Sequence, residues 1–242
     1  MSPLFSPVSA GGTPKATVTA TTGAPTIDTT SRPGKTIYKF TGSGSITVGV
    51  SGTCEALIIG GGSYNGAGGY VYRQNVVLAS GTLGVTIGAG TVIPTNSTAG
   101  LSQLGDLIVF GGGPITYYGQ SGAVILQGGS QGGLTGTGTA IQPLFNGLQG
   151  SAGGIGFAGS PVAAVGGGGG AGGVGGNASS ATVGGNGGPG ATNSITGTAV
   201  TYAAGGGGSP NGTPAGNGAA NTGNGAGYNS TGGSGFVVVV IG

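Results

Sequence analysis

The chain has 242 residues, of which 66 are glycine, with five basic and three acidic side chains, one cysteine and no histidine. Ordinary globular domains carry charge on about a quarter of their residues and glycine on about 7%. A net charge of +2 excludes the basic surface that nucleic-acid binding requires. Hydrophobic residues nevertheless make up 36% of the chain and occur in blocks, which favours an ordered protein over a disordered one.

Residues 1–35 are rich in Thr, Ser, Pro and Ala. Their prolines exclude helices and central strands, so this stretch is predicted to be an extended N-terminal arm or docking segment, with a flexible terminus as the alternative. The opening MSPLFSPVSAGG lacks the basic and apolar regions of a signal peptide, and no apolar run approaches the length of a membrane helix. We therefore expect synthesis in a cytoplasm, no signal peptide and no membrane insertion.

Residues 36–127 have the pattern of a β core. Short runs rich in β-branched and aromatic residues alternate with glycine turns, and no run has helical periodicity. The expected strands are TIYKF (36–40), SITVGV (45–50), CEALIIG (54–60), GYVYRQNVVL (69–78), LGVTIGAG (83–90), DLIVF (106–110) and AVILQ (123–127).

Residues 128–234 form a glycine-rich insertion in which apolar runs lead directly into glycine runs. Gly-Gly-X triplets recur, as in GGVGGN (172–177) and GGNGGP (184–189). A left-handed helix with three residues per turn places X on one edge and bare backbone on the other two, so neighbouring helices can pair through their peptide groups. The triplets predict packed polyglycine-II helices, whereas interruptions such as SSATV (179–183) argue against collagen.

Residues 235–242 return to strand character. The five apolar residues from Phe236 to Val240 require burial on both faces, and the strands of residues 36–127 are the natural partners. The predicted fold is therefore all-β: an antiparallel β-sandwich or jelly-roll-like core that the C-terminal strand completes, with an inserted polyglycine-II-like region.

The sequence predicts no enzyme, no cofactor and no metal site. The pattern G-x-G-x-x-G at 154–159 has no following helix or later acidic residue, and G-x-S-x-G at 128–132 has no histidine base. Cys54 lies in an apolar run and is expected to be a small core residue. Three carboxylates without histidine make a transition-metal site improbable.

Aromatic residues among glycines are the candidate binding groups, because rigid aromatic side chains on Gly, Ser and Asn loops are typical of antibody paratopes. The alternative is that these rings seal the ends of the glycine helices. The candidates for receptor binding are Tyr64, Phe145, Phe157, Tyr202 and Tyr228.

Four segments in order resemble the bacteriophage glycine-rich domain of tail fibres, tail-tip adhesins and minor tail proteins. They are TIYKFTGSGSITV, CEALIIGGGSYNGAGGY, LGVTIGAG and GGSGFVVVVIG, and the resemblance spans roughly residues 36–242. It implies a β domain with glycine-rich segments which, in tip adhesins, pack as polyglycine-II helices with receptor-binding loops. The glycine tracts here are more interrupted by Ser, Thr and Ala than those of the adhesins, and the N-terminal arm is additional.

The resemblance implies a structural virion protein of a phage tail or tail fibre, made in the host cytoplasm. Its N-terminal half would contact other tail proteins, and its glycine-rich loops would contribute to binding a host cell-surface glycan or outer-envelope protein. Homo-oligomers are compatible with this role. The alternatives are a purely structural or decorating virion protein without receptor contact and, less favoured because one cysteine cannot form an intramolecular disulfide, an ice-binding protein.

Overall fold

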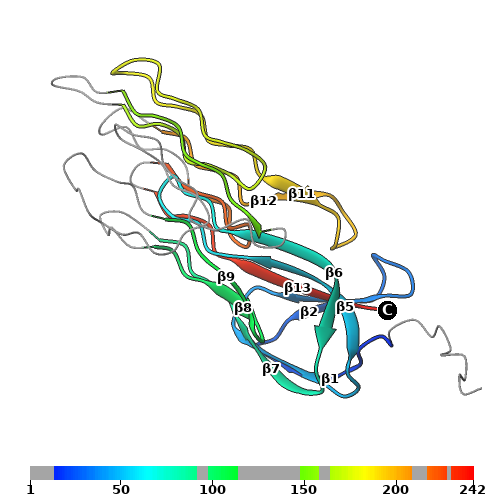
Figure 1. Ribbon diagram of the computed structural model, residues 1–242. Helices are drawn as coiled ribbons and strands as arrows, with labels where there is room; N and C mark the ends of the chain where they lie inside the picture. The colour runs from blue at the N-terminus through cyan, green and yellow to red at the C-terminus, as the bar shows by residue number, and fades with distance from the viewer. Residues whose placement is uncertain (1–13, 92–97, 114–147, 158–163, 209–216, 228–229) are drawn as a thin grey trace, which may run out of the picture.

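A computed structural model describes residues 14–91, 98–113, 148–157, 164–208, 217–227 and 230–242. Within these residues the protein is all-β with antiparallel sheets and no helix, which confirms the predicted fold class. Two sheets pack face to face, and glycine-rich segments extend from one end of them (Figure 1). Of the strands expected from the sequence, 123–127 lies outside the described residues.

Two sheets and one hairpin contain all the strands of the described residues. The central sheet has the order β10 (Leu148–Gln149), β6 (Tyr70–Leu78), β5 (Gly52–Ile59), β13 (Phe236–Ile241), β3 (Thr36–Phe40) and β2 (Thr26–Asp28). The second sheet has the order β1 (Val18–Thr22), β4 (Gly44–Val48), β7 (Gly81–Thr86), β8 (Ser102–Leu104) and β9 (Leu107–Val109). Strands β11 (Ala191–Asn193) and β12 (Val200–Tyr202) form the hairpin.

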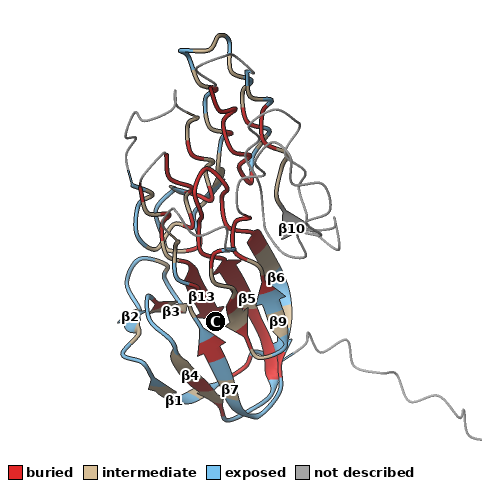
Figure 2. Ribbon diagram, turned by 90° about the vertical axis from the view of Figure 1, so that its left-hand side faces the viewer, coloured by how far each residue is buried: buried red, intermediate tan, exposed pale blue. Residues whose placement is uncertain are grey.

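Strand β13 lies in the middle of the central sheet, hydrogen-bonded to β5 on one side and β3 on the other. Its side chains alternate between two cores, because successive residues of a strand point to opposite faces. Val237 and Val239 lie in the core between the two sheets, whereas Val238 and Val240 pack on the opposite face beneath the β11–β12 hairpin. This double burial explains the uninterrupted apolar run (Figure 2).

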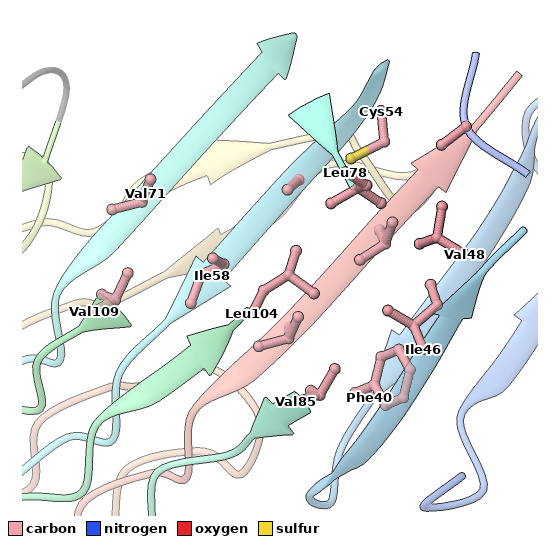
Figure 3. Close-up of a cluster of buried hydrophobic side chains, with 14 residues drawn as sticks. Phe40, Ile46, Val48, Cys54, Ile58, Val71, Leu78, Val85, Leu104 and Val109 are labelled. Carbon is pink, nitrogen blue, oxygen red and sulfur yellow. The ribbon is translucent and has the colours of Figure 1, made fainter. Parts of the chain in front are cut away.

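The core between the sheets is aliphatic, with Phe40 as its single aromatic ring among the fully buried residues (Figure 3). Leu104 and Val85 reach it from the second sheet and pack against side chains of β3, β5 and β13. Cys54 is also buried there, and burial raises the pKa of its thiol to about 12. It is a small core residue without nucleophilic character at neutral pH.

The β core begins earlier than the sequence suggested. Within the expected arm of residues 1–35, β1 pairs with β4 at the edge of the second sheet and β2 pairs with β3 at the edge of the central sheet. The alternating Thr residues of VTATT suit an exposed edge strand, and Pro25 and Pro33 lie outside the strands. Only residues 14–35 of the expected arm are described.

The glycine segments form one packed body, called here the glycine array. At one end of the sheets, the strands of the core run directly into it, which gives the recurrent sequence motif of an apolar run followed by glycines (Figure 1). Part of the array therefore comes from residues 36–127, which were predicted to be β core, in addition to the predicted glycine-rich region 128–234. Its described segments are 60–69, 87–91, 98–101, 110–113, 150–157, 164–190, 203–208, 217–227 and 230–235.

Hydrogen bonds in the array follow a three-residue period. Residues 164–171 show it most fully. The carbonyls of Val165 and Gly168 accept the N–H groups of Gly185 and Gly188, which are also three residues apart, at 3.0 and 2.8 Å. Other groups of 164–171 bond to segments 150–157, 172–177, 203–206 and 63–69, so one segment is surrounded by five others. This is the pattern expected for packed helices with three residues per turn.

Glycine is required where neighbouring backbones touch. A Cβ on Gly168 or Gly185 would come closer than 3.0 Å to the carbonyl oxygen of an adjacent segment, a separation that Cβ atoms do not adopt. The third residue of each triplet faces outward, since Asn186 is exposed while Gly185 and Gly188 are buried. The lattice is thus built from peptide groups, and its side chains line its outer edge.

Candidate functional site

The candidate site is the end of the glycine array farthest from the β core. Ala171, at one end of segment 164–171, lies in the core beneath the hairpin, whereas Ala164 at the other end pairs with Phe157. With about 3.1 Å per residue, these ends are roughly 20 Å apart. Residues 155–157 and 177–183 lie at the far end and are called the tip here.

Backbone and side-chain bonds hold the two parts of the tip together. The N–H of Ile155 donates to Asn177 Oδ1, and the N–H of Ala178 donates to the Ile155 carbonyl, both at 2.8 Å. Residues 179–183 turn back on themselves, with the Ser179 N–H bonded to the Val183 carbonyl at 3.1 Å. The tip is therefore anchored to the array at both of its segments.

Apolar side chains are exposed at the tip although the lattice beneath it is made of backbone. Ile155 and Phe157 are each 42% exposed and Val183 is 52% exposed. Small polar side chains, among them Asn177 and Ser179, accompany them. The chain has no charged side chain after Asp106, so the tip is uncharged and suits a neutral surface that offers apolar patches and hydrogen-bonding groups.

The five predicted site residues have different positions. Phe157 lies at the tip and is exposed. Tyr64 is only 6% exposed and forms a bridge with Ala226 inside the array, and Tyr202 is 2% exposed in β12, where its ring stacks on Phe236 at 6.0 Å. The Tyr202 ring covers the apolar face of the central sheet instead of facing outward, and Tyr64 is enclosed within the array. The list ends with Phe145 and Tyr228, which lie outside the described residues.

Two tip residues, Ile155 and Val183, were not selected from the sequence. The sequence prediction considered only aromatic residues and so missed both. Val183 nevertheless directly precedes a Gly-Gly-X triplet, at a position that the three-residue repeat places on the outer edge. The register of the Gly-Gly-X triplets is therefore the sequence signal that identifies outward-facing side chains.

A charged cluster lies where the turn of the β11–β12 hairpin meets the central sheet, at the end of the sheet away from the array. Glu55 accepts hydrogen bonds on both carboxylate oxygens, from Arg32 at 2.9 and 3.0 Å and from Lys35 at 3.0 Å. Arg32 also donates to the Ile195 carbonyl at 3.4 Å and so links the hairpin to the central sheet. The pKa of Glu55 is lowered to about 2, chiefly by the hydrogen bonds that Arg32 donates, although desolvation acts in the opposite direction. Such a permanently ionised carboxylate is unsuited to acid–base catalysis near neutral pH.

A shallow polar depression of about 410 Å³ lies beside this cluster, and its walls come from Arg32, Tyr72 and residues 192–195. Its polar groups are engaged mainly with one another. Asn193 donates to Tyr70 Oη at 2.8 Å and accepts the Ile195 N–H at 2.7 Å. The arrangement stabilises the hairpin and leaves few groups directed at a ligand.

No group of three or more His, Cys, Asp or Glu side chains in the described part of the chain is placed to hold a metal ion. Nor does any helix there have the length and apolar character to cross a membrane.

Comparisons with known proteins gave no match: no family model fits the chain, and neither curated proteins nor solved structures include a similar one.

Proposed function

We propose that the protein is a structural component of a bacteriophage tail or tail fibre, and that its role is attachment, not catalysis. In this proposal the N-terminal half docks onto other tail proteins and the glycine array presents its tip to the host cell. The observation that carries the proposal is the backbone lattice of residues 164–190, whose three-residue hydrogen-bond period holds an uncharged, apolar tip away from the β core.

A lattice of this kind is well suited to presenting a binding surface. The segments of the array are cross-linked by backbone hydrogen bonds to several neighbours, so the tip is ordered before any partner arrives. Preorganisation lowers the entropy cost of binding, which otherwise consumes much of the contact energy. Exposed rings and aliphatic groups beside Asn and Ser then supply contact area and hydrogen bonds.

The chemistry of the tip favours a neutral partner. Without charge on either tip segment, affinity comes from apolar contact and uncharged hydrogen bonds, which salt screens weakly. A cell-surface glycan or an outer-envelope protein of the host fits this description. We therefore expect host binding that changes little with ionic strength.

The test is binding of purified protein to cells of the host, with three matched variants. Phe157→Ala and Ile155→Ala remove exposed apolar groups at the tip, and each is expected to weaken binding about tenfold without changing the melting temperature. Val174→Ala removes a comparable group, 66% exposed, on the edge of the array outside the tip, and is expected to bind like wild type.

The purely structural alternative predicts that wild type does not bind cells, while antibody labelling still locates it in the virion. Wild-type binding that survives both tip substitutions would remove the tip from the proposal.

A further inference from the structure

An open groove lies along one edge of the β core, distant from the tip in the fold. The two sheets meet where the Gly69 N–H donates to the Phe110 carbonyl at 2.9 Å. From this junction β6 continues along the central sheet and β9 along the second sheet, with a groove of about 560 Å³ between them. Its walls are mainly apolar and include Val77, Leu83, Leu104 and Leu107, with Arg73 and Asp106 as its charged residues.

Both walls of the groove are sheet edges. In the described residues β10 pairs only with Tyr70 and Val71, so the outer edge of β6 from residue 72 to 78 has no partner strand there. Among the residues that the structure describes, β9 is likewise the last strand of the second sheet. Val77 and Ile108, on these two edge strands, are 66% and 44% exposed. Edge strands with exposed apolar residues readily pair with another chain.

The groove also holds two charges that have no partner within the described residues. Five of the eight charged side chains form ion pairs, namely Asp28, Arg32, Lys35, Lys39 and Glu55. Arg73 and Asp106 line opposite walls of the groove, yet no ion pair or side-chain hydrogen bond joins either to another described residue. Arg73 lies four positions after Gly69 and Asp106 lies four positions before Phe110. The two charges are therefore at similar distances from the junction along the groove.

We propose that this groove is the interface of a two-fold homodimer. A two-fold axis parallel to the groove places β6 of one subunit beside β9 of the other. Because β6 runs away from the junction and β9 runs toward it, these edges meet antiparallel. The same rotation sets Arg73 level with Asp106 of the partner subunit, and Asp106 with Arg73 of the partner subunit. A second copy thus matches both the open edges and the charges, as an isologous interface requires.

The test is a charge reversal read out as molecular mass by sedimentation or light scattering over a concentration series. Wild type is expected to dimerise. Arg73→Asp alone places two acidic pairs across the interface, and Asp106→Arg alone places two basic pairs, so each variant is expected to be monomeric where wild type is dimeric. An equimolar mixture of the two variants restores both opposite-charge pairs and is expected to form a heterodimer.

The mixture distinguishes an interface from an interaction within one subunit, because an internal pair cannot be repaired by a second chain. Lys15→Asp, a charge reversal outside the groove, is the control and is expected to leave the dimer intact. Each variant is also checked for an unchanged melting temperature. A monomeric wild type, or a mixture that stays monomeric, would overturn the proposal. The outcome is independent of host binding.

Discussion

Two neighbouring glycines of the array are expected to respond to alanine in opposite directions. A Cβ on Gly205 would overlap the carbonyl of Gly168, which itself accepts the Gly188 N–H at 2.8 Å. At Gly207 the nearest atom to a new Cβ is the Gly185 oxygen at 4.0 Å, in ordinary contact. The comparison therefore separates a lattice position from an edge position within one short tract.

The magnitudes follow from these contacts. Gly205→Ala must displace a neighbouring segment, at about 1–3 kcal/mol for overpacking. It also weakens the bonds that Gly205 and Gly168 make with Gly188, each worth about 1 kcal/mol net. We expect a loss of about 2–4 kcal/mol. Gly207→Ala restricts only the unfolded chain and is expected to stabilise by about 0.4–1 kcal/mol.

The assay is denaturant unfolding of both variants and wild type, with the slope of the transition compared so that a change in stability is separated from a change in compactness. Equal losses for the two variants, or no loss for Gly205→Ala, would contradict a lattice held by close backbone contact.

Further substitutions test the core, the charged cluster and the array edge. Val238→Asp places a charge at a fully buried position of β13, and we expect no soluble folded protein in an expression assay. Because the pKa of Glu55 is lowered from 4.5 to about 2, the stability that its ionised form contributes is present above pH 4.5 and is lost as the pH falls toward 2. Unfolding measured across this pH range should show that loss. In Glu55→Gln this pH-dependent change in stability should be absent. Tyr202→Ala empties a buried site against Phe236 and is expected to cost about 3–5 kcal/mol in chemical unfolding. Asn186→Ser changes an exposed edge residue, and its melting temperature should match that of wild type.

Much of the strand pattern is visible in the sequence, because burial on one face or two leaves a clear signature. TIYKF (36–40) and the apolar run from Phe236 are strands β3 and β13, and double burial of β13 follows from its lack of polar residues. The triplet register also indicated correctly that Gly185 is inside and Asn186 outside. These predictions depend on local periodicity.

The features that the sequence did not reveal depend on distant contacts. Tyr202 directly precedes the tract AAGGGG (203–208), and it belongs to the core because it stacks on Phe236, which is distant in the sequence. The pairing of β1 with β4 was hidden by the prolines on either side of the strand. The charges of Arg32 and Glu55 lie 23 positions apart, and no local pattern predicts that they meet. The tip likewise forms only because segments 150–157 and 177–183 are hydrogen-bonded side by side.

A lattice of peptide groups has consequences for the response to temperature. Unfolding an ordinary core exposes apolar surface and raises the heat capacity, whereas exposing peptide surface lowers it. The glycine array buries backbone against backbone, so its share of the heat-capacity change should be small or of opposite sign. Calorimetry should then give a value per residue below the usual 12–15 cal/mol/K, and a stability curve flatter than that of a side-chain-packed protein. Cooling would weaken the β-sandwich more than the array that it supports.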